Sequence, residues 1–441
     1  MAKSRKAREA ALEALLRIER DGGYSDIVLA QTLARNQLSE RDRAFVSELV
    51  RGVVRWKSFL EHLIASTFHG DPIVIPLDVA LLLKAAFYQI HFMRTPAFAA
   101  VNECIEALKA RKMYAWTGVA NGMLRGYLRR EKTIVLPDEM SSPAAHLAAK
   151  HAHPEWMVAR WLQRYGFSET ERLCEANNQI PPLSVRINRR RITIEAFHQR
   201  LINCGARFQT GTLEGFVRID DLPDAERRRL LQEGLMTVQD ESAGWIGRLA
   251  ADAGSIIYDL CAAPGGKATQ IAEENPSALI IAGDNKRHRA RLIQEATQRL
   301  DLPNIRLLVA DALQPSLRPA PAVLLDAPCS GLGVIRKKPD IKWKRSPEDI
   351  RLLSELQKRL ILHAADLIAV GGCLVYSTCT LEPEENEEIV DFLLQNRDFM
   401  LIPAADAGIP NEFVTPEGYF RTLPHLHAMD GAFAAKLIKR S

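Results

Sequence analysis

The chain has 441 residues, of which 47% are hydrophobic and 25% are charged, and its formal net charge at pH 7 is +4. This composition is that of an ordinary globular protein, and it excludes a mostly disordered or low-complexity chain. The length is enough for two to four domains of about 100–200 residues each. The small positive charge is compatible with a nucleic-acid partner but does not by itself indicate one.

No apolar run reaches the roughly 18 residues that a membrane span needs, and the charged first residues do not resemble a secretory signal. The seven cysteines are odd in number and scattered along the chain. This favours reduced thiols over a disulfide framework. We therefore expect a cytoplasmic protein that has no membrane partner.

Residues 1–138 are expected to form an all-helical domain. Five valines and leucines repeat at intervals of three and four residues, which predicts a helix with one buried face: Val46, Leu49, Val50, Val53 and Val54. Ser39, followed by Glu40 and Asp42, is a plausible start for this helix. The segment 134–146 contains two prolines and two serines, which is typical of a linker.

Residues 139–235 are expected to form a small α+β domain that links the other two domains or binds RNA. The runs at 183–188 and 215–220 are typical of strands, and a helical stretch at 194–204 lies between them. Before them, residues 154–166 begin with proline and end with glycine, which predicts a helix that stops at Gly166. Four arginines cluster behind the first strand and indicate either an RNA contact or a solvated turn: Arg186, Arg189, Arg190 and Arg191.

Residues 236–441 alternate short β-branched runs with helical or loop segments. This pattern predicts a parallel sheet with helices on both faces. The runs begin at Ser255, Ala278, Ile305, Ala322 and Gly372. In such sheets ligands bind outside the carboxyl ends of the strands, so the residues that follow each run are the candidates for a site.

The first run leads into the sequence DLCAAPGGK, from Asp259 to Lys267. Its glycines and alanines allow a backbone to approach a ligand closely and then to start a helix, although an ordinary strand-to-helix turn is the alternative. The sequence does not match GxGxxG, which argues against a nicotinamide dehydrogenase, and it lacks the Gly-Lys-Ser/Thr of a P-loop.

The second and third runs end in acidic residues, Asp284 and Asp311. An acidic residue at the tip of the second strand can accept hydrogen bonds from both ribose hydroxyls of a nucleoside cofactor. Asp311 is then placed to meet the base or its neighbours. Either aspartate alone is weak evidence for a ligand site, because aspartate is a common turn residue. Two such residues beside the glycine turn are stronger evidence.

The fourth and fifth runs each deliver a cysteine to the same expected edge of the sheet. The fourth continues as DAPCSG, from Asp326 through Cys329, and the fifth as STCT, which contains Cys379. Four other cysteines are expected to be small buried side chains: Cys104, Cys174, Cys204 and Cys373. We expect no metal site, because no Cys-x-x-Cys pair or flanking histidine spacing is present.

At these residues the chain resembles a known family. In this order, DLCAAPGGK, DAPCSG and STCT resemble the motifs of RNA (cytosine-C5)-methyltransferases, which use S-adenosylmethionine. The N-terminal segments RKAREAALEALLRIERDGGYSD, FVSELVRGVVRW and PAFAAVNECIEALK resemble a NusB-like RNA-binding helical domain. Together they resemble the bacterial enzymes that methylate 16S ribosomal RNA. The chain departs from the family's usual Asp-Gly-Phe-Phe by carrying Asp430-Gly431-Ala432-Phe433, so one aromatic contact is missing from the pattern.

The resemblance implies an all-α NusB-like N-terminal domain, a small α+β middle domain and, over residues 236–441, an α/β Rossmann-like S-adenosylmethionine-dependent methyltransferase domain. It implies that Cys379 attacks C6 of the target cytosine and that Cys329 helps to release the product. It further implies that Asp326 interacts with the pyrimidine ring, and that Lys267 favours the Cys379 thiolate or assists the same ring. The implied cofactor pocket consists of Cys261, Ala262, Ala263, Pro264, Gly265, Gly266, Lys267, Asp284, Asp311 and Asp326.

C6 of a cytosine is out of reach inside a helix, so the expected substrate is an unstacked cytosine in RNA. Just past the DAPCSG turn, a stretch rich in cations surrounds Trp343: Arg336, Lys337, Lys338, Lys342, Lys344 and Arg345. We expect this stretch to contact phosphates and to stack on a base, with a solvated surface loop as the alternative.

The expected partner is 16S rRNA or a small-subunit assembly intermediate, bound by a monomer that needs no metal. A tRNA cytosine-C5 methyltransferase on the same catalytic domain is the main alternative. A DNA cytosine-C5 methyltransferase is less favoured, because that family does not require the second strand-end cysteine. A non-catalytic RNA-binding factor with a methyltransferase fold is disfavoured by the intact glycine turn, acids and cysteines.

Overall fold

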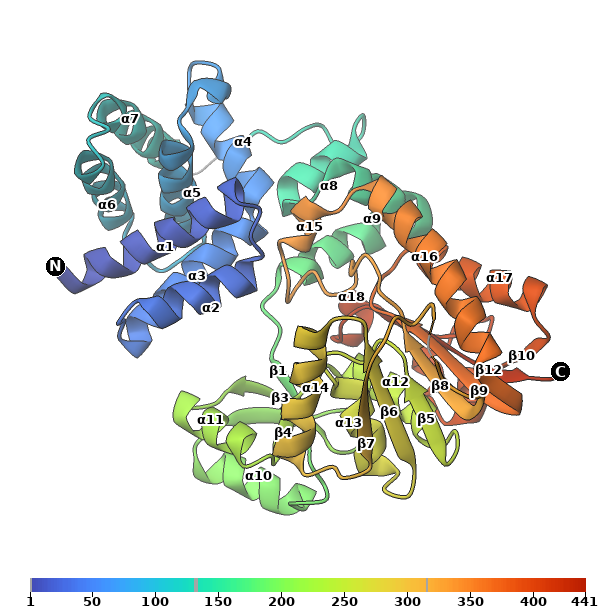
Figure 1. The fold of residues 1–441 in the computed structure, drawn as a ribbon. Helices are drawn as coiled ribbons and strands as arrows, with labels where there is room; N and C mark the ends of the chain where they lie inside the picture. Colours follow the sequence, from blue (N-terminus) through green and yellow to red (C-terminus); the bar gives the residue numbers. More distant parts are fainter. Residues whose placement is uncertain (1, 131–133, 315) are drawn as a thin grey trace. The chain divides into compact units, whose positions relative to one another are not determined.

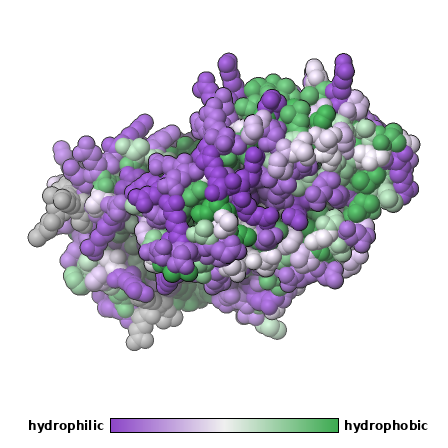
Figure 2. Space-filling view, turned by 90° about the horizontal axis from the view of Figure 1, so that it is seen from below, coloured by the Kyte–Doolittle hydropathy of each residue, from purple (hydrophilic) through white to green (hydrophobic). Residues whose placement is uncertain are grey.

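The computed structural model describes residues 2–130, 134–314 and 316–441, and these form two compact units (Figure 1). Unit 1 comprises Met1–Gln179 and Ile335–Lys344, and unit 2 comprises Ile180–Val334 and Arg345–Ser441. In the part of the chain that is described, no helix is both long and apolar enough to cross a membrane. Polar residues cover most of the face drawn in Figure 2, with apolar residues in small scattered groups, as is usual for the surface of a globular protein.

Unit 1 is helical, which confirms the helical character predicted for its N-terminal part. Its elements are α1 (Ala2–Arg20), α2 (Ser25–Arg35), α3 (Glu40–Arg55), α4 (Lys57–Thr67), η1 (Pro72–Val74), α5 (Leu77–Phe92), α6 (Ala97–Ala110), α7 (Ala115–Arg129), α8 (Pro143–His151), α9 (Glu155–Asn178) and α15 (Ile341–Lys344). The predicted start of α3 is confirmed, because the Ser39 side chain accepts a hydrogen bond from the Asp42 N–H. The predicted apolar face of α3 is buried in the core of the helical bundle.

Helix α9 has a break where the sequence predicts a stop. Gly166 adopts φ 74° and ψ 178°, a conformation outside the helical region that glycine tolerates best. The helix then resumes and continues to Asn178, an extension that the sequence pattern did not predict.

Residues 335–344 belong to unit 1, although in the sequence they lie between strands of unit 2. Lys342 is 0% exposed, and its Nζ donates hydrogen bonds to the carbonyl oxygens of Arg55 and Ala152 at 2.9 and 2.7 Å. The indole N–H of Trp343 donates to the carbonyl oxygen of Val54 at 2.7 Å. The expectation that this stretch contacts RNA is therefore wrong for Lys342, and also for Arg336, which is 7% exposed. For the partly buried Trp343 and the remaining cations it stays a prediction.

The physical reason lies in the ends of the helices. Val54 and Arg55 form the last turn of α3, and Ala152 follows the end of α8. Carbonyl groups there have no partner within the helix, so they accept hydrogen bonds from a buried amine. Burial, then the charge of Arg55, lowers the pKa of Lys342 well below its usual value. Lys344 repeats the pattern by donating to the carbonyl oxygens of Gly22 and Gly23, both at 2.7 Å, just past α1.

Unit 2 begins with a small antiparallel sheet, which confirms the predicted α+β character of the middle region. Its elements are β1 (Leu183–Ile187), α10 (Ile194–Asn203), β2 (Arg207–Thr210), β3 (Phe216–Asp221), α11 (Asp224–Gln232) and β4 (Met236–Val238), with strand order β2-β3-β1-β4. Phe197 and Leu201 of α10 pack with Val185 and Val217 of the strands to form its core.

Arg186 is neither an RNA contact nor part of a solvated turn, the two alternatives left open for the arginine cluster. This side chain is 4% exposed, and its guanidinium donates to both carboxylate oxygens of Glu273 at 2.9 and 3.0 Å. It also donates to the carbonyl oxygen of Gly266 at 2.9 Å. Arg186 thus fastens the small sheet to the helix that follows the glycine turn.

The second sheet of unit 2 contains β5 (Ile256–Asp259), β6 (Leu279–Asp284), β7 (Ile305–Val309), β8 (Ala320–Asp326), β9 (Ile368–Thr378), β10 (Phe399–Ile402), β11 (Phe420–Thr422) and β12 (Ala432–Lys439). The order is β10-β12-β9-β8-β5-β6-β7, with β11 beside β12. The predicted parallel sheet is confirmed for β5 to β9. The C-terminal strands pair antiparallel, which makes the sheet mixed.

Alternating side chains of this sheet face two helical layers, as the two-residue period of a strand requires. Ile257 packs in one core with residues of α12 (Glu241–Ala251), α13 (Gly266–Glu274) and α14 (Arg287–Leu300). Its neighbour Tyr258 packs in the other, with residues of α16 (Pro347–Asp366) and α17 (Glu387–Asn396). The remaining short elements are η2 (Pro383–Glu385), η3 (Ala404–Ala407), η4 (Asn411–Phe413) and α18 (Pro424–His427). Ala432, the departure from the family pattern, is buried at the start of β12.

Candidate active site

The carboxyl ends of four neighbouring strands bring the predicted residues to one edge of the sheet. Asp284, Asp259 and Asp326 end β6, β5 and β8, and Cys379 directly follows β9. Asp326 lies beside Ser377 in the parallel register of β8 and β9. This arrangement is the one expected for a ligand site in an open parallel sheet.

Cys329 and Cys379 come together although fifty residues separate them in the sequence. Their sulfur atoms lie 3.2 Å apart, and the backbone N–H of Cys379 donates to the Cys329 sulfur at 3.3 Å. Both residues are partly exposed. The hydrogen bond with Cys379, followed by burial, raises the pKa of Cys329 well above its usual value. Cys329 therefore keeps its proton and can donate it toward a thiolate on Cys379.

Lys267 and Asp326 form an ion pair beside the cysteines. The Nζ atom of Lys267 donates to Asp326 Oδ2 at 2.7 Å, and the Ser377 hydroxyl donates to Asp326 Oδ1 at 2.8 Å. Burial lowers the pKa of Lys267, but the charge and hydrogen bond of Asp326 outweigh it, so the pKa lies above its usual value. Lys267 is thus a cation held in place, and Asp326 a carboxylate with both oxygens engaged. Ser377 was not singled out from the sequence, although it is the first residue of the STCT motif, two positions before Cys379.

The glycine turn between β5 and α13 is shaped for a close approach of backbone. Gly265 adopts φ 105°, a conformation that side chains rarely allow, and it caps the N-terminus of α13. Cys261 belongs to this turn, and burial raises its pKa to about 12. Cys261 is therefore a neutral thiol, which suits a place in the wall of a pocket.

Asp284 and Asp311 differ in their surroundings. Asp284 is 3% exposed; its Oδ1 accepts from the Lys286 N–H at 2.9 Å, and its Oδ2 lies 3.4 Å from Arg289 Nε. Asp311 lies two residues beyond the end of β7, is exposed, and accepts from the Leu313 N–H at 3.0 Å. Asp284 is thus a preorganised acceptor, whereas Asp311 is at the rim of this edge.

Asp259 is an acidic residue that the sequence analysis quoted within its motif but did not select. Its side chain is 1% exposed. Burial, then the nearby charge of Asp326, raises its pKa to about 8, against the opposing effect of Lys267. Asp259 is therefore a neutral acid below about pH 8, and the other two acids at this edge each face a cation, Asp326 with Lys267 and Asp284 with Arg289.

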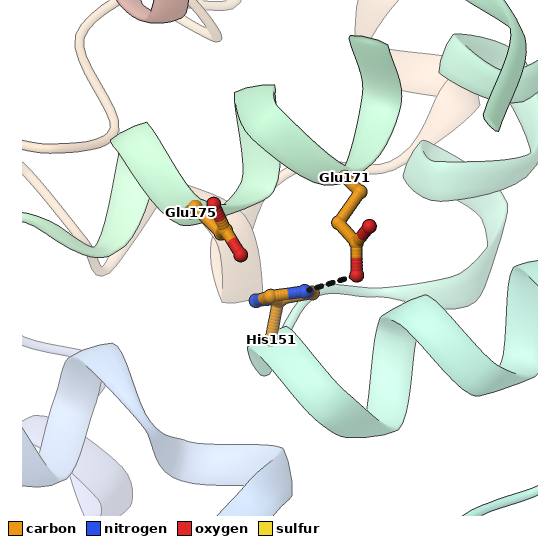
Figure 3. A group of neighbouring side chains, drawn as sticks. All are labelled: His151, Glu171 and Glu175. Carbon is orange, nitrogen blue, oxygen red and sulfur yellow. Dashed lines mark ion pairs between the residues drawn. The ribbon is translucent and has the colours of Figure 1, made fainter. Parts of the chain in front are cut away.

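One group of side chains in the described part of the chain is close enough to share a metal ion, and it lies in unit 1. His151 at the end of α8 faces Glu171 and Glu175 on one side of α9, and their ligand atoms lie within 4.8 Å of one another (Figure 3). Lys150 already donates to Glu171 at 2.6 Å, and burial lowers the pKa of His151. We interpret the group as a polar cluster that joins the two helices. The expectation of no metal stays a prediction.

Comparisons with known proteins agree along the length of the chain. The family model "16S rRNA methyltransferase RsmB/F" matches residues 247–438, and the NusB family model matches residues 5–129. The ferredoxin-like domain of RsmF/B-like methyltransferases matches residues 153–220.

Curated relatives match over nearly their full lengths. The probable ribosomal RNA small subunit methyltransferase B of Synechocystis is 35% identical, with 98% of this chain and 99% of the relative covered. The protein of the same name from Bacillus subtilis is 32% identical, over 99% of this chain and 100% of the relative.

Among solved structures, PH0851 shares the fold with a TM-score of 0.81 at 24% identity, over 99% of both chains. A methyltransferase homolog from Pyrococcus horikoshii is 27% identical with a TM-score of 0.58, and it covers 67% of this chain and 99% of its own. The chain therefore belongs to the RsmB/F family of 16S rRNA methyltransferases, with a NusB helical N-terminal domain, a small middle domain and a C-terminal α/β methyltransferase domain.

Proposed function

We propose that this chain transfers a methyl group from S-adenosylmethionine to C5 of a cytosine in 16S rRNA, through a covalent adduct between Cys379 and C6 of the base. The observation that carries the proposal is the pair of cysteine sulfurs 3.2 Å apart at the ligand edge of the sheet. The Lys267–Asp326 ion pair beside them supplies the charged groups that a pyrimidine ring needs.

The residues at this edge fit the cofactor. When bound, S-adenosylmethionine supplies an electrophilic methyl group on a positively charged sulfur. The turn from Cys261 to Lys267 allows a close approach of the ligand at Gly265, and Asp284 is the acceptor for the ribose hydroxyls, with Asp311 beyond it. Asp259, once ionised above about pH 8, adds a negative charge that suits the positive charge of this ligand.

Cys379 makes C5 reactive. C5 of cytosine is a poor nucleophile, but a thiolate that adds to C6 moves the double-bond electrons to C5, which then behaves as an enamine carbon. The Cys329 thiol stabilises the Cys379 thiolate by a hydrogen bond between the two sulfurs. Asp326 accepts a hydrogen bond from the exocyclic amine and Lys267 donates one to N3, where charge develops during the addition.

Cys329 then assists release. After methylation, C5 carries both a methyl group and a proton. A base removes that proton, its bonding electrons reform the C5–C6 double bond, and Cys379 leaves as a thiolate. Conversion of Cys379 to a thioether removes the bond that does most to raise the pKa of Cys329. Cys329 therefore gives up its proton more easily once the adduct exists, which couples its two roles to the progress of the reaction.

The substrate must present an unstacked cytosine, since C6 is shielded within a helix. A loop of 16S rRNA, either free or in a cytoplasmic assembly intermediate of the small subunit, meets this requirement. Bisulfite sequencing of total RNA from a strain that lacks the gene tests the proposal. We expect one or a few 16S cytosines to lose their protection from bisulfite conversion in that strain. Loss of protection in tRNA instead would move the chain to the tRNA alternative.

A further inference from the structure

Glu385 is a buried acid that holds the turn carrying Cys329 through hydrogen bonds. It is 0% exposed. Its Oε1 accepts from the Ser330 N–H at 2.8 Å and from the Gln357 amide at 3.0 Å, and its Oε2 accepts from the Ser330 hydroxyl. The same Gln357 amide donates to the carbonyl oxygen of Pro328 at 2.8 Å. Both residues that flank Cys329 are therefore held, either directly by Glu385 or through Gln357.

Asn386, the next residue, holds the turn carrying Cys379 through hydrogen bonds. It is 1% exposed. Its Oδ1 accepts from the Thr378 hydroxyl, and its Nδ2 donates to the Thr380 carbonyl oxygen at 3.2 Å. Both residues that flank Cys379 are thus bound by one side chain.

Further hydrogen bonds connect these two sets of contacts to each other and to the sheet. The hydroxyl groups of Ser330 and Thr380 lie 2.7 Å apart and join the two turns. The Tyr376 hydroxyl, from β9, donates to the carbonyl oxygen of Glu385 at 2.6 Å. Several buried hydrogen bonds that share members restrict the movement of the groups they join. Adjacent residues of one short segment therefore hold the two sulfur-bearing turns in a common frame.

We propose that Glu385 and Asn386 are positioning residues that divide the reaction between them. Glu385 holds Cys329 for release of the product, and Asn386 holds Cys379 for attack on C6. The inference rests on the proposed function, because it assigns each residue to one step of that reaction.

The charge of Glu385 adds a second effect on the release step. Three donors converge on its carboxyl group, as suits the ionised form, although burial raises its pKa. Its negative charge is one of the causes that raise the pKa of Cys329. In Glu385→Gln the amide can keep the same hydrogen-bond frame, since its oxygen accepts from Ser330 N–H and Gln357 while its NH2 donates to the Ser330 hydroxyl. This variant therefore removes the negative charge and retains the hydrogen bonds to Ser330 and Gln357.

The experiment compares Glu385→Ala, Glu385→Gln, Asn386→Ala and wild type in the full chain, with a labelled rRNA fragment and S-adenosylmethionine. Single-turnover methylation reports attack, and denaturing gel electrophoresis reports the covalent protein–RNA species. Glu388→Gln is the matched control, because Glu388 is an exposed glutamate in the same segment. Near-UV circular dichroism checks folding, and Asn386→Asp, which retains the acceptor for Thr378, replaces the alanine variant if that variant does not fold.

We expect Glu385→Ala to accumulate the adduct and Asn386→Ala to form it roughly tenfold to a hundredfold more slowly, as a displacement of reacting groups produces. We expect Glu385→Gln to release product at a lower pH than wild type, because the pKa of Cys329 falls when the charge is removed. A merely structural role would not move this pH profile.

Equal losses in both steps for Glu385→Ala and Asn386→Ala, or wild-type behaviour of both, would overturn the division of roles. An unchanged pH profile in Glu385→Gln would overturn the effect of its charge. The proposed function fails by a different result, in which wild type itself leaves C5 of cytosine unmethylated in the same fragment.

Discussion

Lys267 and Asp326, 59 residues apart in the sequence, are joined by a hydrogen bond of 2.7 Å at the ligand edge of the sheet. The lysine comes from the turn that starts α13 and the aspartate ends β8. Asp326 raises the pKa of the nearby Asp259 carboxyl, and Lys267 lowers it. The positive charge of Lys267 therefore reduces the repulsion between the two acids.

Lys267→Met leaves Asp326 without its cation. A partly buried charge that loses its partner is costly, so we expect the free energy of unfolding to fall by about 1–3 kcal/mol and methylation to be lost. Urea unfolding and a methyl-transfer assay measure the two effects. Lys338→Met, at an exposed lysine, is the control for the free energy of unfolding and should leave it unchanged. Wild-type activity of Lys267→Met would remove Lys267 from the site.

Asp284→Ala should weaken the binding of S-adenosylmethionine by roughly 1–3 kcal/mol, the usual loss for a hydrogen bond to a buried charged group. Asp284 is buried and held by the Lys286 N–H, so its carboxylate is prepared to accept from the ribose. Calorimetric titration gives the affinity, with the exposed Asp252→Ala as the comparison. Unchanged affinity in a folded Asp284→Ala protein would place the cofactor elsewhere.

Cofactor affinity should rise with pH because of Asp259. Its pKa is raised to about 8 by burial and by Asp326, while Lys267 opposes the rise and Asp284 adds to it. Below that pH the carboxyl is protonated and must lose a proton before it can favour a positively charged ligand. Affinity for S-adenosylmethionine should therefore increase from about pH 6 to about pH 8 and then level off.

The same linkage releases a proton on binding, which calorimetry in two buffers of different ionisation enthalpy detects. Asp259→Asn cannot titrate, so its affinity should vary less with pH than that of the wild type. A wild-type affinity that is flat across this range would show that the cofactor does not sense Asp259.

Lys342→Met should destabilise the protein without changing its electrostatic attraction to RNA. Its Nζ serves the carbonyl oxygens of Arg55 and Ala152 and the side chain of Asn178, so the loss leaves buried acceptors unpaired at about 1–3 kcal/mol. Because Lys342 is buried, the slope of RNA affinity against salt should stay as in wild type. A slope reduced by about one would mean that Lys342 contacts a phosphate after all.

The parts of the site that follow strand ends could be predicted from the sequence. The period of apolar runs marks where β6, β8 and β9 end, and this alone places Asp284, Asp326 and Cys379 at one edge. Parallel strands make that inference safe, since their carboxyl ends meet on the same side. The antiparallel C-terminal strands leave no such signal, because their pairing depends on contacts distant in sequence.

The residues that the sequence misassigned are charged side chains whose partners are distant. From the sequence alone, Lys342 and Arg186 resemble solvated or RNA-binding cations. In the structure, Lys342 donates hydrogen bonds to carbonyl groups at helix ends, and Arg186 donates to Glu273. Glu385 and Asn386 were missed for the same reason. Nothing local distinguishes an acid that receives three buried donors from one that faces water.

In the proposed reaction, Cys379 forms the adduct and Cys329 resolves it. Each is replaced by alanine, and a labelled rRNA fragment is incubated with S-adenosylmethionine and run on a denaturing gel. We predict no shifted band and no methylation for Cys379→Ala, and an accumulating band for Cys329→Ala, because the C6 thioether then waits for a base to take the C5 proton. A band with Cys379→Ala and none with Cys329→Ala would contradict the account.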